Sequence, residues 1–299
     1  MSDSDTYGDT YGAIHALAQD ADDHRWAFGT GFTDALEGVD TAVPAGVDAP
    51  ALAVYCLMLG DDALIFSHRL QQWMTRAPEL EEETALGNIA LDLLGQARML
   101  LARAGAAEGA GRDEDQLAFF RTDGEFRNVR LVERADADFA ELVARLLIFS
   151  TWRLALFGEL TGSRDPVLAA IAAKGVKELT YHRDYAAQWV VRLGDGTELS
   201  HDRMQAALNI YGPMLDELFT PHSIETALGG VAVEVAGLRA EVDAVLDTVL
   251  VAATLDRPAI AALAGVAGRA GRDGVHTEDM GFILAEMQSV ARAHPGATW

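Results

Sequence analysis

Cysteine and lysine are nearly absent from this sequence. Its 299 residues include one cysteine, Cys56, and two lysines, Lys174 and Lys177. A single cysteine excludes an internal disulfide framework and a zinc site built from cysteines, and it is typical of a protein kept in a reducing cytosol. A lone thiol in a helical run of leucines is a poor candidate nucleophile, so we interpret Cys56 as a small core residue.

Positive charge is scarce as a whole, and nearly all of it is arginine. Lysine and arginine together number 23 against 46 acidic residues, which gives a net charge of -23. Binding to nucleic acid or to an anionic membrane needs a surplus of cations, so both kinds of partner are disfavoured. The acidity fits solubility, salt adaptation or biased codon usage, and it also fits a basic partner that covers part of the surface.

Long apolar runs and targeting signals are missing. No stretch of about 18 uncharged apolar residues occurs, which argues against a membrane span. The first residues, 1–5, show neither a basic region nor an apolar run of the kind found in secretory signals. We therefore expect a cytoplasmic protein. Phosphate loops, dinucleotide-binding glycine motifs and a Gly-x-Ser-x-Gly elbow are missing too, which removes the commonest nucleotide and hydrolase chemistries.

The first 49 residues differ in composition from the rest. They hold ten acidic residues and one basic residue, Arg25, so they carry −9 and leave −14 for the other 250 residues. Glycine and proline cluster between Gly38 and Pro50, as in a loop. We predict an acidic N-terminal extension over 1–49, with one short helix near 25–36, packed across the main domain or a partner. The remaining residues, 50–299, form the predicted helical domain.

Apolar residues recur at helical spacing almost everywhere after Pro50. Asp165 and Pro166 are a typical N-cap and first helical residue. The class is therefore all-α, and helices longer than twenty residues suit a bundle whose core has room for a cofactor, with additional C-terminal helices. The predicted long helices cover 52–74, 79–104, 137–160 and 166–194. The further predicted helices cover 197–219, 224–253, 258–268 and 276–294, and residues 125–130 have a pattern compatible with an extended segment.

A bundle of long helices raises the hypothesis of a di-iron carboxylate oxygenase. Such a centre takes a glutamate from each of two helices and a Glu-x-x-His pair from each of the other two, because that spacing places both side chains on one face. Of the eight histidines only His201 has a glutamate, Glu198, three places earlier. That pair falls in the first turn of a predicted helix, where a glutamate suits the helix dipole, so we favour a structural role.

Two of the long helices carry polar residues close to core positions. Residues 84–97 contain a single charge, Asp92, and Gln96 follows one turn later. Glu178 and His182 are four residues apart and within reach of one another. A buried carboxylate must be paired, hydrogen-bonded or protonated. A histidine on an apolar face is more often a satisfied core residue than a metal ligand, so these residues supply at most half of a metal site.

Several short motifs are similar to one known family. Together they resemble the C-subunit family of the bacterial ring 1,2-phenylacetyl-CoA epoxidase, from about residue 50 to the end, and the acidic extension lies outside the resemblance. The motifs are LGDDALI at 59–65, APELEEE at 77–83, NIALDLLGQAR at 88–98, GRDED at 111–115, FRNV at 126–129, KELTYH at 177–182, RLGDGT at 192–197 and HTEDMGFILAEMQ at 276–288.

The resemblance implies a ferritin-like helical bundle and a place in aerobic phenylacetate degradation. In that family the di-iron site and the CoA-thioester substrate belong to a homologous catalytic subunit, whereas the C-type chain is a structural partner without a working metal centre. The implied partners are this di-iron catalytic subunit and, beside it, a small accessory subunit and a reductase of the same complex. The resemblance implies no catalytic, cofactor-binding or metal residue in this chain.

The ligand motifs of the catalytic subunit are altered in this chain. Where that subunit has Asp followed by Glu-x-x-His, this chain has Asp92, Leu93 and Gln96, and at the second motif it has Leu179 and retains His182. Leucine in place of glutamate exchanges ligand oxygens for apolar packing and favours a metal-free core. The polar residues that we interpret as buried remnants of a ferritin-like centre are Asp62, Asp92, Gln96, Glu178 and His182.

The sequence therefore predicts a non-catalytic subunit that holds the catalytic subunit helix against helix. Two alternatives stay open. One is an orphan scaffold outside phenylacetate metabolism, because a single subunit sequence carries no substrate-contacting motif. The other is an independently active di-iron oxygenase, which needs an atypical metal site drawn from Asp61 or Asp62, Asp92, Glu159, Glu178 and His182.

Overall fold

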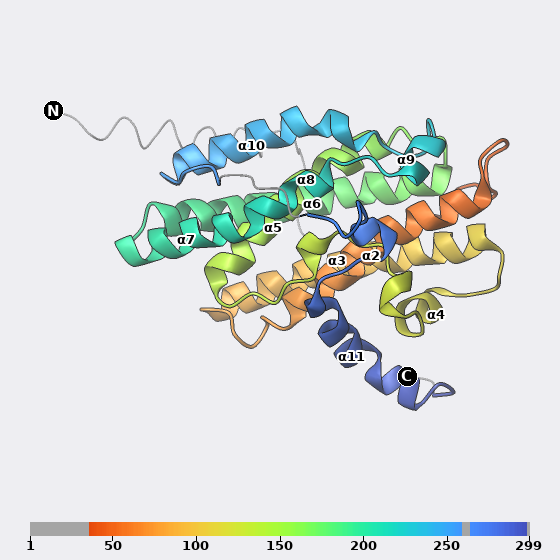
Figure 1. Cartoon of the computed structure of the whole chain (residues 1–299), viewed down its shortest axis with the longest axis horizontal. Coiled ribbons are helices and arrows are strands. Elements are labelled where there is room, and N and C mark those ends of the chain that lie inside the picture. Colours follow the sequence, from red (N-terminus) through yellow and green to blue (C-terminus); the bar gives the residue numbers. More distant parts are fainter. Residues whose placement is uncertain (1–35, 259–263, 298–299) are drawn as a thin grey trace.

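The protein is all-helical in the part that the structure, a computed structural model, describes, residues 36–258 and 264–297 (Figure 1). Four long helices form a bundle: α2 (Ala49–Gln71), α3 (Leu80–Glu108), α5 (Phe139–Leu160) and α6 (Pro166–Gly194). They contain 23, 29, 22 and 29 residues, so the predicted all-α class and the four long helices are confirmed. The arrangement is compatible with a ferritin-like bundle.

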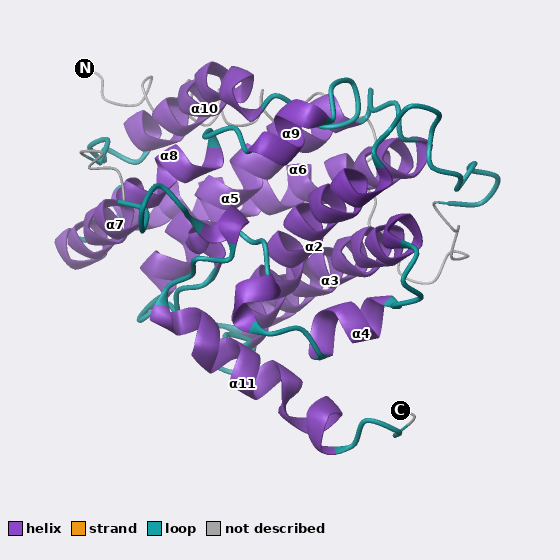
Figure 2. Cartoon of the chain, turned by 45° about the vertical axis from the view of Figure 1, so that its right-hand side comes forward, coloured by secondary structure: helices purple, strands orange, loops and turns teal. Residues whose placement is uncertain are grey.

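Shorter helices surround the bundle (Figure 2). The α-helices are α4 (Glu114–Phe119), α7 (Glu198–Tyr211), α8 (Leu215–Leu218), α9 (Ser223–Ala227), α10 (Arg239–Ala252) and α11 (Glu278–Ala293). The 3-10 turns are η1 (Asp123–Glu125), η2 (Arg130–Val132), η3 (Gly212–Met214), η4 (Val235–Leu238) and η5 (Gly271–Asp273).

The four bundle helices divide into an inner and an outer pair. In α5, 18 of 22 residues are buried, and in α2, 17 of 23. In α3 only 13 of 29 residues are buried, and in α6 only 12 of 29. Short helices cover the inner pair, with α7 and α10 packed against α5 and with α9 and α11 packed against α2. The outer pair is covered less completely, by α4 on α3 and by α7 and α10 on α6. One side of α3 and α6 therefore stays open to solvent.

Helices α3 and α6 run antiparallel and share a line of polar contacts, which we call the α3–α6 seam. Near the start of α3, Glu82 accepts hydrogen bonds from Tyr185 and Trp189 near the end of α6, at 2.6 and 2.9 Å. Near the end of α3, Arg103 forms a buried ion pair with Asp165, which caps the start of α6. Asp165 as N-cap with Pro166 at the first helical position confirms that sequence prediction.

The described part of the N-terminal extension lies against the bundle. Its apolar residues pack on the core, and the carbonyl oxygens of Thr41 and Ala42 accept hydrogen bonds from the buried Arg103. Asp48 caps α2 by accepting a hydrogen bond from the amide of Ala51 at 2.9 Å. The short helix predicted near 25–36 lies outside the described residues.

The C-terminal third departs from the predicted long helices. The helix predicted over 197–219 stops at Tyr211, because Gly212 and Pro213 interrupt it and proline removes a backbone donor. The helix predicted over 224–253 is also wrong, since Gly229 and Gly230 turn the chain after α9, with Gly230 at φ +76°. Residues 264–268, the described end of the helix predicted over 258–268, are a turn with an isolated bridge.

Two local features were missed or only partly expected. Helix α4 lies in the Gly- and Asp-rich loop after α3, and its signal was the capping box between Asp113 and Gln116. The extended segment expected over 125–130 is shorter, because η1 and η2 occupy its two ends. Among the described helices α2 alone has the length and hydropathy to cross a membrane, and 72% of its apolar window is buried inside the protein.

The Arg103–Asp165 pair generates a stability prediction. Asp165→Ala removes the counter-charge of a buried arginine, and we expect the free energy of unfolding to fall by about 3–5 kcal/mol, as when one partner of a buried pair is lost. Urea denaturation followed by circular dichroism measures this change. Asp113→Ala is the control, because Asp113 is an exposed N-cap whose loss costs about 1 kcal/mol. Equal losses in the two variants would contradict the ion-pair argument.

Candidate functional site

The middle of the α3–α6 seam brings together four of the five polar residues singled out from the sequence. Nε2 of His182 lies 3.0 Å from Oδ2 of Asp92. The side-chain amide of Gln96 donates a hydrogen bond to Glu178 at 3.0 Å. Lys174 completes the group from the surface, with its amine 3.0 Å from the second Glu178 oxygen. Each carboxylate in this part of the seam therefore has a partner on the protein itself.

The two leucines that stand in for ligand glutamates are in the core. Leu93 of α3 and Leu179 of α6 are both fully buried. The family resemblance assigns these two positions to ligand glutamates of the catalytic subunit, and Gln96 and His182 follow three residues later, where it assigns histidines. The centre of the bundle therefore offers methyl groups at two positions where a metal would need oxygen.

A buried arginine that the sequence reasoning missed occupies the centre of the bundle. Arg153 of α5 is fully buried, and its Nε donates a hydrogen bond to Oε1 of Gln96 at 3.0 Å. Its Nη2 donates to the carbonyl oxygen of Leu59 on α2 at 3.2 Å. Since Gln96 also bonds to Glu178, one chain of contacts joins all four bundle helices.

The surroundings of Arg153 are mostly apolar, and its charge is balanced at longer range. The guanidinium lies 4.4 Å from the ring centre of Phe157 and 5.5 Å from that of Phe149. Burial lowers the pKa of Arg153 to about 10, while the negative charges of Asp62 and Glu178 act in the opposite direction. The guanidinium is therefore charged at neutral pH.

This donor set is poorly suited to a di-iron centre. A pair of iron ions needs several carboxylates and two imidazoles aimed at the same point. Here the single seam histidine contacts Asp92, and leucine stands at the two positions that the family resemblance assigns to ligand glutamates. The buried guanidinium of Arg153 adds a positive charge to the core. Metal cations placed close to that guanidinium would be repelled by it.

Asp62 is buried, but its carboxylate does not join the seam. It forms a two-point ion pair with Arg272 at 2.9 and 2.8 Å and accepts a hydrogen bond from the amide of Val129 at 2.8 Å. Burial raises the pKa of Asp62 against the opposing effect of the Arg272 charge. Glu159, another member of the atypical metal site considered above, is exposed beside an open surface pocket.

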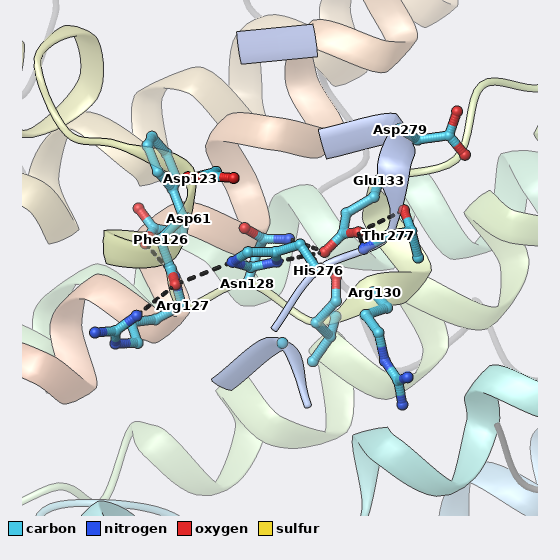
Figure 3. Close-up of polar contacts among 12 residues, drawn as sticks. Asp61, Asp123, Phe126, Arg127, Asn128, Arg130, Glu133, His276, Thr277 and Asp279 are labelled. Carbon is cyan, nitrogen blue, oxygen red and sulfur yellow. Dashed lines mark hydrogen bonds and ion pairs between the residues drawn. The ribbon is translucent and has the colours of Figure 1, made fainter. Parts of the chain in front are cut away.

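Three fully buried carboxylates form a second polar group, which we call the carboxylate clamp. It consists of Asp61 with Arg121, Asp62 with Arg272, and Glu133 with His276. Figure 3 shows Glu133 and His276 facing one another, with Asn128 and Thr277 beside them. Motifs of the resemblance at 59–65, 126–129 and 276–288 meet here. Asp62 links α2 to the C-terminal segment through Arg272, Glu133 links that segment to the loop after η2 through His276, and Asp61 links α2 to the loop after α4 through Arg121.

His276 makes two hydrogen bonds that need a proton on each ring nitrogen. Nδ1 lies 2.6 Å from Glu133, and Nε2 lies 3.2 Å from the carbonyl oxygen of Phe126, which can only accept. Burial lowers the pKa of His276, but the hydrogen bond to Glu133 and the charge of Glu133 outweigh it, so the pKa is raised above 6.5. The pair therefore favours an imidazolium bound to a carboxylate.

The remaining candidate residues have structural tasks. Glu198 is exposed in the first turn of α7, and Nδ1 of His201 lies 2.8 Å from the carbonyl oxygen of Gly194 at the end of α6. Glu198 therefore lies in the first helical turn, as predicted. Cys56 is fully buried in α2, and burial raises the pKa of its thiol, as expected of a core residue.

A methionine at position 153 tests the central chain of contacts. Arg153→Met leaves Gln96 and the Leu59 carbonyl without their donor, so the free energy of unfolding should fall by about 2–4 kcal/mol. In the double variant with Gln96→Leu the loss should be smaller than the sum of the two single losses, because one orphaned acceptor is gone. Urea denaturation of all three variants measures this. Arg98→Met, at an exposed arginine of α3, should change stability by less than about 0.5 kcal/mol. Additive losses would contradict the coupling.

The His276–Glu133 pair predicts a pH-dependent stability. Because the pKa of His276 is raised on folding, its contribution is complete below about pH 6.5 and is lost as the pH rises through the folded-state pKa. The difference in unfolding free energy between the wild type and His276→Gln should therefore be larger at about pH 6 than at about pH 9. His294→Gln, at an exposed histidine, is the control and should show no such trend. A difference for His276→Gln that does not change with pH would contradict the assignment.

Comparison with known proteins agrees with these observations. The family described as phenylacetic acid catabolic protein matches residues 38–299. The chain is also 44% identical over 250 residues to the C subunit of 1,2-phenylacetyl-CoA epoxidase from Escherichia coli (strain K12), and the match covers 83% of this chain and 99% of that protein. The resemblance carried by the short motifs is thereby confirmed. The chain belongs to the phenylacetic acid catabolic protein family.

Proposed function

We propose that this chain is a non-catalytic structural subunit of a multicomponent ring 1,2-phenylacetyl-CoA epoxidase in aerobic phenylacetate catabolism. Its task is to bind and support a homologous di-iron catalytic subunit. The observation that carries the proposal is Arg153, whose buried guanidinium bonds to Gln96 at the bundle centre, where a di-iron protein would hold its metals. A positive side chain held by hydrogen bonds stabilises the bundle without iron.

The partner assignment is supported by the relative. The Escherichia coli protein is named as one lettered subunit of an epoxidase, and 99% of its length is covered by the match. A protein named in this way acts with other subunits, and the homologous di-iron subunit is the partner that we propose for this chain. A small accessory subunit and a reductase of the same complex are the further partners, and the cytoplasm is the proposed location.

The rival function, an independently active oxygenase with an atypical metal site, finds less support in the geometry. Its proposed ligands are spread over three places: Asp61 and Asp62 are bound to arginines, Glu159 is at the surface, and Asp92 and His182 bond to each other. A metal would have to break buried ion pairs to collect these groups, and each broken pair costs several kcal/mol.

Co-expression with the homologous catalytic subunit, in medium supplemented with iron, tests the proposal. We expect the two chains to co-purify, and we expect iron to be bound by the catalytic subunit while this chain, purified alone, has far less than one iron per molecule. Elemental analysis and turnover of phenylacetyl-CoA measure both points. Turnover should require the catalytic subunit and rise when this chain is added.

Three results would contradict the proposal. They are two bound irons per molecule of this chain, failure of the chains to co-purify, and turnover that does not depend on this chain. The catalytic subunit purified alone is the positive control for iron loading, so a low iron content in this chain cannot be attributed to the growth conditions.

A further inference from the structure

The outer side of α3 and α6 carries an exposed apolar strip. Leu91 on α3 is 62% exposed and Tyr181 on α6 is 42% exposed. The neighbouring residues of the seam, Asp92 and His182, contact one another, so Leu91 and Tyr181 lie at the same level on the two helices. We call the surface formed by Leu91, Leu94 and Gly95 of α3 with Lys174, Lys177 and Tyr181 of α6 the α3–α6 face.

The α3 half of this face lacks the charges that a solvent-facing helix normally has. Residues 84–97 contain one charge, Asp92, and that carboxylate is turned into the seam. An exposed helix side is usually rich in charged residues. The centres of protein interfaces, by contrast, are depleted in charge and enriched in aromatic residues. The composition of the face is therefore that of a contact surface.

Both lysines of the chain lie on the α6 half of the face. Lys174 is paired with Glu178, whereas Lys177 has no partner among the described residues and is exposed. In a protein of net charge -23, a pair of cations beside an apolar strip is a local exception. The chemistry that complements it is an apolar surface bordered by carboxylates.

The aromatic part of the face is held in place before any partner binds. The hydroxyl of Tyr185 and the indole N–H of Trp189 both donate to Glu82, and the ring of Tyr185 lies 6.5 Å from that of Tyr181. An aromatic side chain that is already ordered loses little conformational entropy on binding. Tyr181 is therefore suited to be an anchor of an interface.

The dimensions of the face suit another helical layer. At 1.5 Å per residue, the 29-residue helices α3 and α6 are each about 40 Å long. Two adjacent helices are roughly 20 Å wide, so the outer side of the helix pair, with the α3–α6 face at its middle, measures at most about 800 Å², because α4 also packs on α3 and both α7 and α10 pack on α6. This upper limit is what each partner contributes to an interface of standard size. A single bound peptide helix would leave half of it exposed, whereas a second pair of long helices would cover it.

A second copy of this chain is a poor occupant. In a two-fold symmetric dimer the same patch meets itself, so Lys177 faces an apolar and basic patch instead of carboxylates, and two strongly acidic chains repel each other. A related but different subunit avoids this conflict, because its surface can place carboxylates opposite the lysine.

We infer that the α3–α6 face is the docking surface for the homologous catalytic subunit, which would contribute a pair of long helices with carboxylates opposite Lys177. The inference rests on the proposed function and adds the site and the chemistry of the contact. Leu91 and Tyr181 supply the apolar centre of the contact. Lys177 fixes how the two subunits are aligned along their helices. The same arrangement leaves the surfaces of α7 and α10 out of this contact.

Binding of single-residue variants to the catalytic subunit tests the inference. Leu91→Arg should raise the dissociation constant by about 30-fold or more, which is the effect of losing an interface hot spot. Leu199→Arg is a matched control, because Leu199 on α7 is also 62% exposed, and its affinity should equal that of the wild type. Lys177→Glu changes an exposed side chain, so it leaves the core intact. It should weaken binding, and added salt should weaken the binding of this variant less than it weakens the binding of the wild type.

The outcomes separate this inference from the proposed function. If the wild type fails to bind the catalytic subunit, the proposed function is contradicted. If the wild type binds and both Leu91→Arg and Lys177→Glu bind equally well, the function stands and the docking surface is wrong. Sedimentation of this chain alone adds a third outcome, since a dimer that Leu91→Arg converts to monomer would assign the face to a second copy and overturn the inference.

Discussion

The structure depends on one constraint: a charge buried in this bundle must be met by an opposite charge or by hydrogen-bond partners. Arg153 at the bundle centre meets it in part: Nε and Nη2 bond to Gln96 and the Leu59 carbonyl, whereas Nη1 has no hydrogen-bond partner among the described residues of the protein. Through Gln96 and Glu178 these contacts join all four bundle helices. Asp62 and Asp165 satisfy it through buried ion pairs with arginines. Because an unmatched charge costs several kcal/mol, these pairs fix how the helices are placed against each other.

Under the proposed function, the same constraint accounts for a bundle that is stable without metal. A di-iron centre and its ligand glutamates would supply both the positive charge and the negative charge of the core. Leu93 and Leu179 stand at the positions that the family resemblance assigns to those glutamates, and the charges near the centre are instead the Arg153 guanidinium and, beyond the amide of Gln96, the Glu178 carboxylate. The carboxylates and the histidine of the seam are thereby engaged with other side chains of the protein, and the outer sides of α3 and α6 stay open to solvent.

Part of the candidate site could be predicted from the sequence, and part could not. Leu93, Gln96, Leu179 and His182 were placed at the bundle centre from helical spacing together with the resemblance to the ligand motifs of the catalytic subunit. Arg153 was missed, since nothing in its own segment distinguishes a buried arginine from a surface one. Asp62 was grouped with the other buried polar remnants of a ferritin-like centre, yet its carboxylate is bound to Arg272, which lies 210 residues away in sequence.

The sequence by itself determined the all-α class, the four long helices, the cap at Asp165 and the two leucines in the core. These features follow from local patterns: apolar spacing at the helical period, proline and cap positions, and residue type. It did not determine the breaks at Gly212 and Gly230, where a helical pattern continues through residues that stop a helix. The tertiary structure alone decided which charges meet and which face stays open. Those outcomes depend on the relative rotation and shift of packed helices, which no local pattern specifies.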